Sequence, residues 1–577
     1  MAKRSGAVHV ATTSRTYGKT VYQTVLLRRS YRQGGKVKHE TLGNISHLPP
    51  ETIHLIRESL AGKAFISAND AFDIERSLPH GHVKAVLGTM NKLGIEALIS
   101  STPSRERDLV MAMIAQRVIN PGSKLDHTRD WKNTSLGREL GVEDADVHEL
   151  YAAMDWLVGR QERIENKLAK RHFEEGGLAL YDVSSSYCEG TKCPLVQFGY
   201  SRDGKQGKPI IVYGLLADRR GRPVSISVYP GNTGDPTTVP DQVKKLKGRF
   251  KLNRIVMVGD RGMLTDPQIE EIAKQQGLGW ISALKGQAIR KLVDNENIQM
   301  SLFDQQGLVE VVSSLYPGER LVFCFNPLLE EKRKKERERL LARTTVDLNK
   351  IKVEAAHRTR VKLSDAKIGV KVGKVIGRHK MGKHFETKIS NGQLEWSLNK
   401  ESIKREAELD GIYVIRTSES GESFDKPDVV RTYKELSVVE NAFRCLKGPD
   451  LSVRPIRHWT ADHVRAHLFI CMLAYYVYWH MKTALAPLLF VDETLSEDRK
   501  ERDPIKPAEP SKEAKRKKSE LVGEDGLEIQ SFSSLMRNLA TLCLNFCVAK
   551  GDPSRAQFVK QTQSTPLQAR AFELLGL

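Results

Sequence analysis

The run LALYDVSSSY, Leu178–Tyr187, is apolar and ends in polar residues, which is typical of a buried β-strand. Two similar runs follow it, IIVYGLLAD (Ile210–Asp218) and PVSISVYPG (Pro223–Gly231). Beyond them the pattern predicts a helix, a strand, a helix and a strand, over Thr237–Phe250, Arg254–Asp260, Thr265–Gly277 and Gly279–Lys285. Three strands followed by alternating helices and strands indicate an α/β fold, in which an antiparallel meander is extended by βα units.

This order of elements is that of an RNase H-like fold, and two of its strands end in an aspartate, Asp182 and Asp260. Catalytic and binding groups gather at the carboxyl ends of strands in α/β sheets. A single aspartate at such a position is usually a turn or helix cap. Because the first and fourth strands are neighbours in this topology, we expect both carboxylates to point at one spot.

A third acid, Glu440, lies in a helical segment predicted over Val429–Leu446. The apolar residues beside it recur at helical spacing and predict a buried stripe made of Leu436, Val439, Phe443 and Leu446. An ordinary amphipathic helix with a Glu440–Arg444 pair is the alternative interpretation, and it leaves the two strand-end aspartates unexplained.

Three carboxylates at one spot suit the cleavage of phosphodiester bonds. Two Mg²⁺ ions about 3.5–4 Å apart activate the attacking oxygen and stabilise the leaving oxygen in such sites. Mg²⁺ prefers oxygen ligands and keeps several waters, so three acids and the substrate phosphates suffice. We therefore predict that Asp182, Asp260 and Glu440 bind two Mg²⁺ ions, with Mn²⁺ as a possible substitute.

The composition points to a polyanionic partner. The 577 residues include 91 Lys or Arg and 71 Asp or Glu, a net charge of +20, which favours nucleic acid. A hydrophobic fraction of 40% excludes a wholly disordered or collagenous chain. The most apolar run, Leu468–Trp479, is too short to cross a membrane and predicts a buried helix.

The seven cysteines include no CxxC pair, so we expect a cytoplasmic protein without a disulfide framework. Cys543 and Cys547, four residues apart, predict one face of a buried helix.

Residues 1–170 are interpreted as an N-terminal DNA-binding and dimerisation region. Alternating apolar and polar residues from Thr20 to Leu42, with Gly34-Gly35 in the middle, predict a β-hairpin. Its basic residues that are candidates to face DNA phosphates are Arg28, Arg29, Arg32 and Lys36. An ordinary solvated hairpin is an equal alternative. Helical patterns follow at Pro50–Leu60, Val83–Leu93, Ser104–Arg117 and Asp146–Leu168.

The remaining chain is divided into four parts. Residues 171–285 and 406–482 form the two parts of the catalytic core, separated by a β-rich insertion over 286–405. The insertion holds a charged helix (Leu328–Glu354) and strand-like pieces at KIGVKVGKVIG and HFETKI. Residues 483–577 form a helical C-terminus whose stretch 496–520 is charged, poor in apolar residues and predicted to be a disordered linker.

Several segments carry a resemblance to a known family: YDVSSSY, VGDRGM, LDGIYVIRTS, LSVRPIRHW and SYRQGGKVKHETLGN. From about residue 20 to 482 the chain resembles the DDE transposases of bacterial insertion sequences, in the subgroup with a Tyr-Arg-Glu-Lys signature and a β-rich insertion. Tyr433, Glu440 and Lys447 fall on that signature, whereas Leu436 stands at its arginine position. Arg444, one turn after Glu440, is the candidate substitute.

The resemblance implies an enzyme that binds terminal inverted repeats, cleaves transposon ends by Mg²⁺-dependent hydrolysis and joins their 3′-hydroxyls to target DNA. A homodimer would pair two ends in a synaptic complex in the bacterial cytoplasm, bound to the nucleoid, with no membrane partner. Tyr433, Arg444 and Lys447 would hold phosphates beside the cut. Further candidates for DNA contact are Arg261, next to Asp260, and two cations of the loop Gly199–Pro209, Arg202 and Lys205.

Two alternatives stay open at this point. An RNase H-like DNA nuclease without strand transfer would use the same three acids. A non-catalytic DNA-binding protein would not need them.

Overall fold

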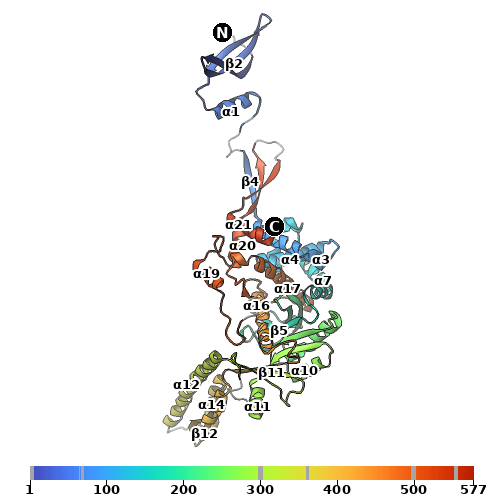
Figure 1. Ribbon diagram of the computed structural model, residues 1–577, viewed down its shortest axis with the longest axis vertical. Helices are drawn as coiled ribbons and strands as arrows, with labels where there is room; N and C mark the ends of the chain where they lie inside the picture. The colour runs from blue at the N-terminus through green and yellow to red at the C-terminus, as the bar shows by residue number, and fades with distance from the viewer. Residues whose placement is uncertain are drawn as a thin grey trace. The chain divides into compact units, whose positions relative to one another are not determined.

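The computed structural model describes residues 6–63, 65, 71–296, 303–358, 363–495, 502–550 and 556–577. Within them the chain is a mixed α/β protein with one large mixed sheet and many helices (Figure 1). It divides into two compact units. One consists of residues 1–78 and 544–562, and the other of residues 79–543 and 563–577.

The large sheet has eight strands in the order β10-β11-β14-β9-β8-β5-β6-β7. All five strands expected from the sequence are present, as β5 (Leu178–Tyr187), β6 (Ile210–Asp218), β7 (Pro223–Pro230), β8 (Ile255–Gly259) and β9 (Leu278–Ala283). The first three form an antiparallel meander, and β8 pairs in parallel with both β5 and β9. The sheet is continued in antiparallel fashion by β14 (Ile412–Thr417), β11 (Arg320–Phe325) and β10 (Leu308–Val311).

The central strands are buried along their length, and all nine residues of β6 are buried. Strands covered on both faces carry continuous apolar runs rather than alternating ones. One helix, α9 (Val239–Lys244), which continues as the π-helical turn η3 (Lys245–Arg249), lies between β7 and β8 in sequence, and a second, α10 (Asp266–Ala273), lies between β8 and β9. These correspond to the two helices expected between β7 and β9.

A layer of helices surrounds the long apolar helix α17 (Ala461–Ala484), whose middle, from Ala466 to Tyr478, is buried. The expected buried helix at Leu468–Trp479 is therefore confirmed. No helix in the described part of the chain is long and apolar enough to cross a membrane. The layer contains α2 (Gly81–Lys92), α3 (Ile95–Ile99), α4 (Arg105–Ile119), α5 (Lys124–Asp130), α6 (Leu136–Glu139), α7 (Val147–Val158) and α8 (Gln161–His172).

The helix starts in this layer are set by local sequence. Ser104 accepts a hydrogen bond from the Arg107 backbone N–H and caps α4, and Asp146 and Glu149 form a capping box at α7. Such caps satisfy backbone donors that the helix itself leaves without partners.

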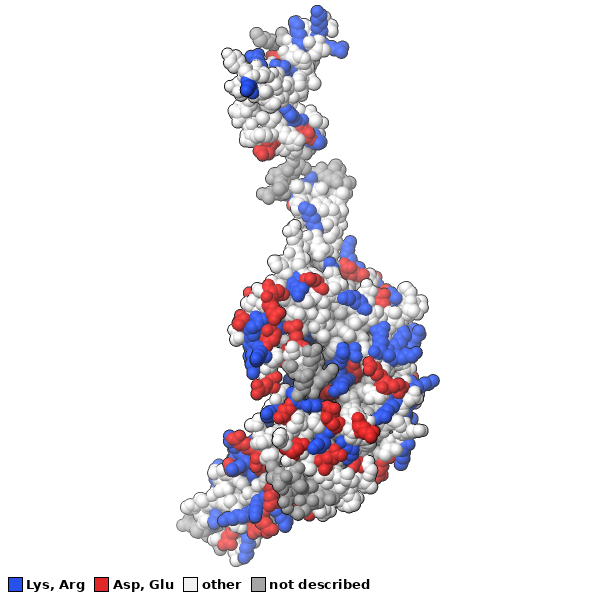
Figure 2. All heavy atoms as spheres, viewed as in Figure 1, with Lys and Arg blue, Asp and Glu red and all other residues white. Residues whose placement is uncertain are grey.

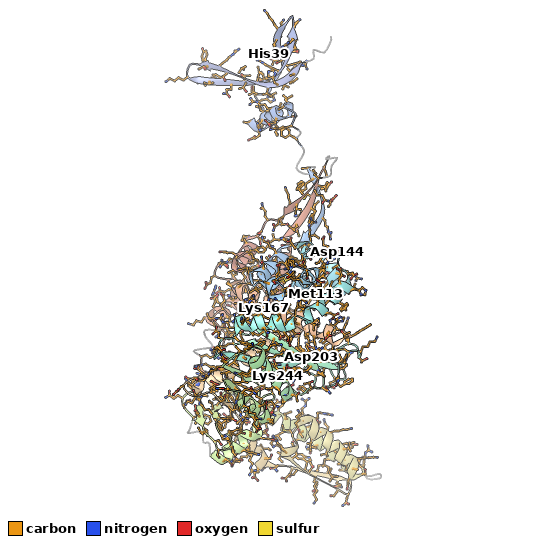
Figure 3. All side chains as sticks on the ribbon, turned by 90° about the vertical axis from the view of Figure 1, so that its right-hand side faces the viewer. His39, Met113, Asp144, Lys167, Asp203 and Lys244 are labelled. Atoms are coloured by element: carbon orange, nitrogen blue, oxygen red, sulfur yellow. The ribbon has the colours of Figure 1, made fainter. Side chains whose placement is uncertain are left out.

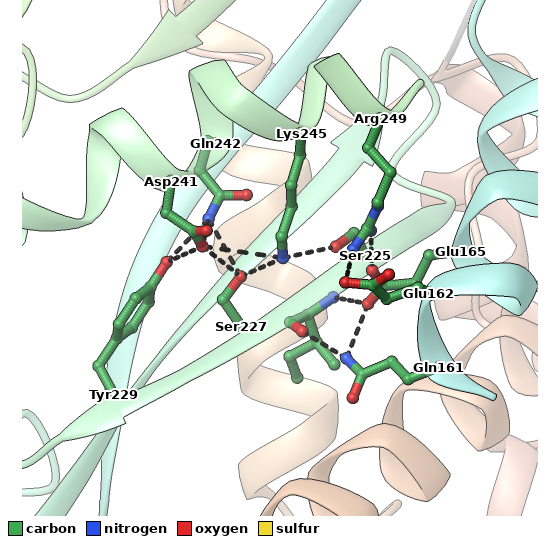
Figure 4. Close-up of polar contacts among 11 residues, drawn as sticks. Gln161, Glu162, Glu165, Ser225, Ser227, Tyr229, Asp241, Gln242, Lys245 and Arg249 are labelled. Atoms are coloured by element: carbon green, nitrogen blue, oxygen red, sulfur yellow. Dashed lines mark hydrogen bonds and ion pairs between the residues drawn. The ribbon is translucent and has the colours of Figure 1, made fainter. Parts of the chain in front are cut away.

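A polar network attaches edge strand β7 to the surrounding helices (Figure 4). Lys245 Nζ donates to Ser225 Oγ at 3.1 Å, and Glu165 of α8 accepts hydrogen bonds from Gln161 and from the Ile226 backbone N–H. Arg249 completes the network through an ion pair with Glu165. Because Glu165 is only 1% exposed, its charge requires these donors.

The stretch expected as an insertion contains α11 (Gly286–Glu296), β10, β11, α12 (Pro327–His357), α13 (Asp365–His379), β12 (Phe385–Ser390), β13 (Gln393–Leu398) and α14 (Lys400–Ala407). The charged helix and the strand at HFETKI are confirmed. The strand expected at KIGVKVGKVIG is wrong, because this segment is α13. Ile368 and Val372 are buried one turn apart there, so helical spacing outweighs the Val/Lys alternation.

The smaller unit contains a three-stranded antiparallel sheet of β1 (Ala7–Tyr17), β2 (Thr20–Gln33) and β3 (Lys36–Asn44), followed by α1 (Pro50–Leu60). The predicted hairpin is confirmed, and Gly34 and Gly35 both have positive φ in its turn. A second sheet is formed by β4 (Phe72–Pro79), β15 (Cys543–Ala549) and β16 (Gln557–Gln561). Cys543 and Cys547 therefore lie in a strand, and the expected helix is wrong because pairing with β16 decides the conformation.

Part of the expected disordered linker is ordered. Residues 496–501 lie outside the described residues, but Ile505 is buried and α19 (Lys512–Glu520) begins at the capping residue Ser511. The Lys517 amine donates to the Ala486 carbonyl at 2.9 Å. Packing against the core thus orders a stretch whose composition alone favours disorder. The chain closes with the two expected short helices, α20 (Phe532–Ala540) and α21 (Pro566–Leu575).

The insertion helix α12 is joined to the segment before β14 by a buried ion pair. Arg337 donates to both carboxylate oxygens of Asp410, with Nη1 at 2.9 Å from Oδ1, and the two side chains are 9% and 5% exposed. Removing one partner of such a pair leaves a buried charge without compensation and costs about 3–5 kcal/mol.

We therefore expect Arg337→Met to lower the free energy of unfolding strongly. This free energy can be measured by urea denaturation, with unfolding monitored by tryptophan fluorescence. The double variant Arg337→Met/Asp410→Leu should be less destabilised than the single variant, because no unpaired charge remains. Equal losses in both variants would contradict this account.

Candidate active site

The parallel pairing of β5 and β8 brings Asp182 and Asp260 together. Asp260 directly follows β8, as expected. The expectation that Asp182 also ends its strand is wrong, because β5 continues to Tyr187 through its pairing with β6. In the register of this pair Tyr181 lies opposite Gly259, so the next residues along the two strands are Asp182 and Asp260. The expectation that the first and fourth strands are neighbours is confirmed.

Asp182 is a half-buried carboxyl group in a negatively charged environment. Its pKa is raised to about 7, mainly by burial and also by the charges of Asp260 and Glu440, against the opposing effects of a hydrogen bond and of Arg202. The hydrogen bond comes from the Val183 backbone N–H, 2.7 Å from Asp182 Oδ1. The three acids expected from the sequence are therefore electrostatic neighbours.

Asp260 is exposed and is oriented by Tyr433. This tyrosine belongs to α15 (Lys426–Lys434), and its hydroxyl lies 3.1 Å from Asp260 Oδ1. Burial raises the pKa of Tyr433, and the adjacent Asp260 charge raises it further, so the hydroxyl stays protonated and donates. The Gly262 backbone N–H donates to the other carboxylate oxygen at 3.3 Å.

Glu440 is exposed on α16 (Leu436–Lys447), a helix that packs against β5. The predicted apolar stripe is confirmed, because Leu436, Val439, Phe443 and Leu446 are all buried. No residue in the described part of the chain forms a hydrogen bond or ion pair with the Glu440 carboxylate. Its charge acts on the neighbouring Asp182.

The acids share a region without surrounding a single point. Among the residues that the structure describes, no group of three or more His, Cys, Asp or Glu side chains is gathered closely enough to hold a metal ion. The donor set nevertheless suits a divalent cation. A desolvated carboxyl group whose pKa is raised by two neighbouring carboxylates is an arrangement that positive charge would relieve.

Lys447 and Arg202, both predicted to contact DNA, form ion pairs with acidic side chains instead. Lys447 and Arg454 both pair with Asp203, which is labelled in Figure 3 and whose side chain is 1% exposed. Asp203 also accepts a hydrogen bond from the Tyr187 backbone N–H at 3.0 Å. Arg202 forms an ion pair with Asp235. The loop Gly199–Pro209 is thus tied to α16 and to the 3₁₀ turn η2 (Asp235–Thr238) that follows β7.

Sequence reasoning missed Asp203 and Arg454. The only local signal for Asp203 is its place next to Arg202, in a glycine-containing loop that suggests a turn. Arg454 lies in the segment LSVRPIRHW, whose sequence predicts no partner.

The other predicted contacts are accessible. Lys205, Arg261 and Arg444 are exposed, and none of their side chains forms a hydrogen bond or ion pair with a described residue. In the smaller unit, Arg29 lies 3.7 Å from Glu40, Arg28 is half-buried, and Arg32 and Lys36 are exposed at the hairpin end. Basic and acidic side chains are interspersed over the visible face of the larger unit (Figure 2).

Known proteins match two stretches of the chain. The family described as "Transposase DDE domain" matches residues 190–477, which include Asp260 and Glu440 and begin after Asp182. The "IS1634 family transposase, N-terminal domain" matches residues 10–70. No curated protein matches the chain at a significant level.

Among solved structures, a piggyBac transposase synaptic complex with hairpin DNA shares 10% sequence identity with the chain, at a TM-score of 0.33. The match covers 80% of this chain and 76% of that one. A TM-score of this size does not establish a shared fold. The two family matches, one to the DDE domain and one to the N-terminal domain, show that the chain belongs to the DDE transposases of insertion sequences.

Proposed function

We propose that this transposase binds the terminal inverted repeats of its element, cleaves them hydrolytically and joins the resulting 3′-hydroxyls to target DNA. The observation that carries the proposal is the pairing of β5 with β8, which sets Asp182 beside Asp260 with Glu440 electrostatically coupled to them. The order β7-β6-β5-β8-β9 supports an RNase H-like core.

In this proposal Asp182 and Asp260 hold divalent metal, with Glu440 as the third acid and Mg²⁺ as the physiological ion. Divalent metal bound there would polarise the scissile phosphate and lower the pKa of the attacking hydroxyl or water. Membership of the DDE transposase family favours a divalent metal ion, and the oxygen-only donor set suits Mg²⁺ or Mn²⁺.

The residues around the acids have separate roles. Tyr433 holds the Asp260 carboxylate in one orientation through its hydrogen bond. Arg261 and Arg444 are exposed beside two of the acids and are suited to hold phosphates next to the cut. Because Asp203 engages Lys447, this lysine fixes the loop Gly199–Pro209 against α16 and reaches DNA only if that pair opens.

The signature subgroup is part of the proposal. Tyr433, Glu440 and Lys447 match the Tyr-Arg-Glu-Lys spacing, and Arg444 lies on the same helix as Glu440 in place of the signature arginine. We further propose that the smaller unit contributes to repeat recognition through its basic hairpin, that a homodimer pairs two ends, and that the protein acts at the bacterial nucleoid.

Cleavage and joining can be tested with purified full-length protein, a labelled duplex carrying the terminal repeat of its own element, a plasmid and Mg²⁺. Wild type should give 3′-end nicks and joined products. Asp182→Asn and Glu440→Gln should reduce both to background, whereas Glu422→Gln, which neutralises an exposed acid elsewhere, should not. Nicks without joined products would favour a nuclease, and binding without either product would favour a non-catalytic DNA-binding protein.

The raised pKa of Asp182 predicts a pH-dependent stability. Its folded pKa of about 7 exceeds the ordinary value of 3.8, so the folded state binds the proton more tightly. The associated stabilisation is fully present below pH 3.8 and is lost as the pH rises through 7. Without divalent metal, Asp182→Asn should therefore match wild type in melting temperature at pH 4 and exceed it at pH 8.

Divalent metal should reverse that difference. At pH 8, Mg²⁺ should raise the melting temperature of wild type more than that of Asp182→Asn, because only the wild-type carboxylate ionises to bind it. Glu422→Gln, as a control, should respond like wild type. A melting-temperature difference that does not change with pH would contradict the assigned ionisation.

Tyr433→Phe tests the orienting role of the tyrosine hydroxyl. A hydrogen bond to a charged group contributes about 1.5–3 kcal/mol, which corresponds to a fall of roughly 10- to 150-fold in cleavage rate. DNA affinity, measured by fluorescence anisotropy, should stay within twofold of wild type. A loss of affinity at an unchanged cleavage rate would show that Tyr433 contacts phosphate instead.

A further inference from the structure

The insertion contains a groove of about 930 Å³ between α12 and α13, formed by residues other than the three acids. Arg339, Arg343, Val346 and Lys350 are spaced by four, three and four residues, so they share one face of α12. The full lining comprises Arg339, Ala342, Arg343, Val346, Asp347, Lys350, Arg378 and His379.

The groove is positively charged. Its single carboxylate, Asp347, accepts hydrogen bonds from Lys350 Nζ at 3.1 Å and His379 Nε2 at 3.2 Å, and Arg339 pairs with Glu336 of its own helix. The exposed guanidinium groups of Arg343 and Arg378 form no hydrogen bond or ion pair with any residue in the described ranges. Two arginines from two helices therefore face solvent in one groove with unused donors.

The helix α12 begins close to the candidate active site. Arg333, in its second turn, donates to the carbonyls of Leu409 and Ile412. Its pKa is lowered mainly by burial and also by the charge of Arg261, the residue after Asp260. The first turns of α12 are thus electrostatic neighbours of the segment that carries one catalytic acid.

Helix geometry gives the distance from there to the groove. At 1.5 Å per residue, Arg339 and Lys350 lie roughly 10 and 25 Å along the α12 axis from Arg333. One turn of B-form DNA spans about 34–36 Å. One helical turn of duplex is therefore longer than the stretch of α12 from Arg333 to the far end of the groove at Lys350.

We propose that the α12–α13 groove binds the sugar–phosphate backbone of duplex DNA within one helical turn of the cleaved bond, with Arg343 and Arg378 as its phosphate ligands. Guanidinium groups suit phosphate because they offer two parallel donors. A protein partner with acidic side chains is the alternative occupant. DNA is favoured because the family acts on DNA and because the groove adjoins the helix that leads from the acids. The inference rests on the proposed function for the position of the cleaved bond.

The test measures equilibrium DNA binding by the full-length protein. Binding is monitored by fluorescence anisotropy over a salt series, with Ca²⁺ in place of Mg²⁺. The variant Arg343→Gln/Arg378→Gln is compared with Lys334→Gln/Lys352→Gln, which removes the same charge from exposed positions of α12 that do not line the groove. Three duplexes show which DNA the groove binds. They are the terminal repeat alone, the repeat extended by about one turn (~10 bp) of flanking DNA, and an unrelated target sequence.

Each lost phosphate contact changes the slope of log affinity against log salt by about 0.9. The groove variant should therefore show a slope shallower by about 1.8 on at least one duplex, whereas the control pair should change little. Arg343→Lys/Arg378→Lys should restore most of the slope. Loss confined to the repeat-containing duplexes would assign the groove to the transposon end or its flank, and loss confined to the target sequence would assign it to target DNA.

Equal slope changes in the groove variant and the control pair would overturn the proposal, because net charge alone would explain them. An unchanged slope on all three duplexes in a variant with wild-type melting temperature would also overturn it and favour a protein occupant. These outcomes do not depend on catalysis. A wild-type protein that binds but never cleaves would overturn the proposed function and leave the slopes interpretable.

Discussion

The parallel pairing of β5 with β8 is the constraint on which the candidate active site depends. Main-chain hydrogen bonds place Tyr181 opposite Gly259, so the next residue on each of the two paired segments is an aspartate, Asp182 within β5 and Asp260 directly after β8. Electrostatics oppose this arrangement, because burial and two neighbouring carboxylates raise the pKa of Asp182. The buried apolar strands hold the acids together against that repulsion, and a bound cation would remove it.

A second set of contacts holds α16 and its acid against the sheet. Asp203 is buried and receives two cations and a backbone N–H, from Lys447, Arg454 and Tyr187. Removing a buried ion from water is costly unless its partners are well placed. This carboxylate therefore fixes the loop that carries Arg202 and Lys205 to the end of the helix that carries Glu440. The exposed cations Lys205, in that loop, and Arg444, on α16, therefore lie on segments that these contacts hold in place.

Much of the core could be predicted because its signals are local. The apolar runs of β5 and β6 indicate buried strands, and the stripe beside Glu440 has helical spacing. Errors occurred where two patterns competed or where pairing decided. In α13 the Val/Lys alternation suggested a strand, but Ile368 and Val372 pack at helical spacing. Strand β11 was not expected, because its partner β14 lies about 90 residues further along the chain.

The sequence by itself determined the elements of the core, the positions of the three acids on them and the excess of positive charge, because apolar periodicity and residue type are local properties. Only the tertiary structure decided which cations are available to a ligand. Lys447 and its partner Asp203 are 244 residues apart, and Tyr433 and Asp260 are 173 apart. An ion pair or hydrogen bond across such a separation leaves no local pattern, because it forms only after packing has brought the two side chains within a few ångströms of each other.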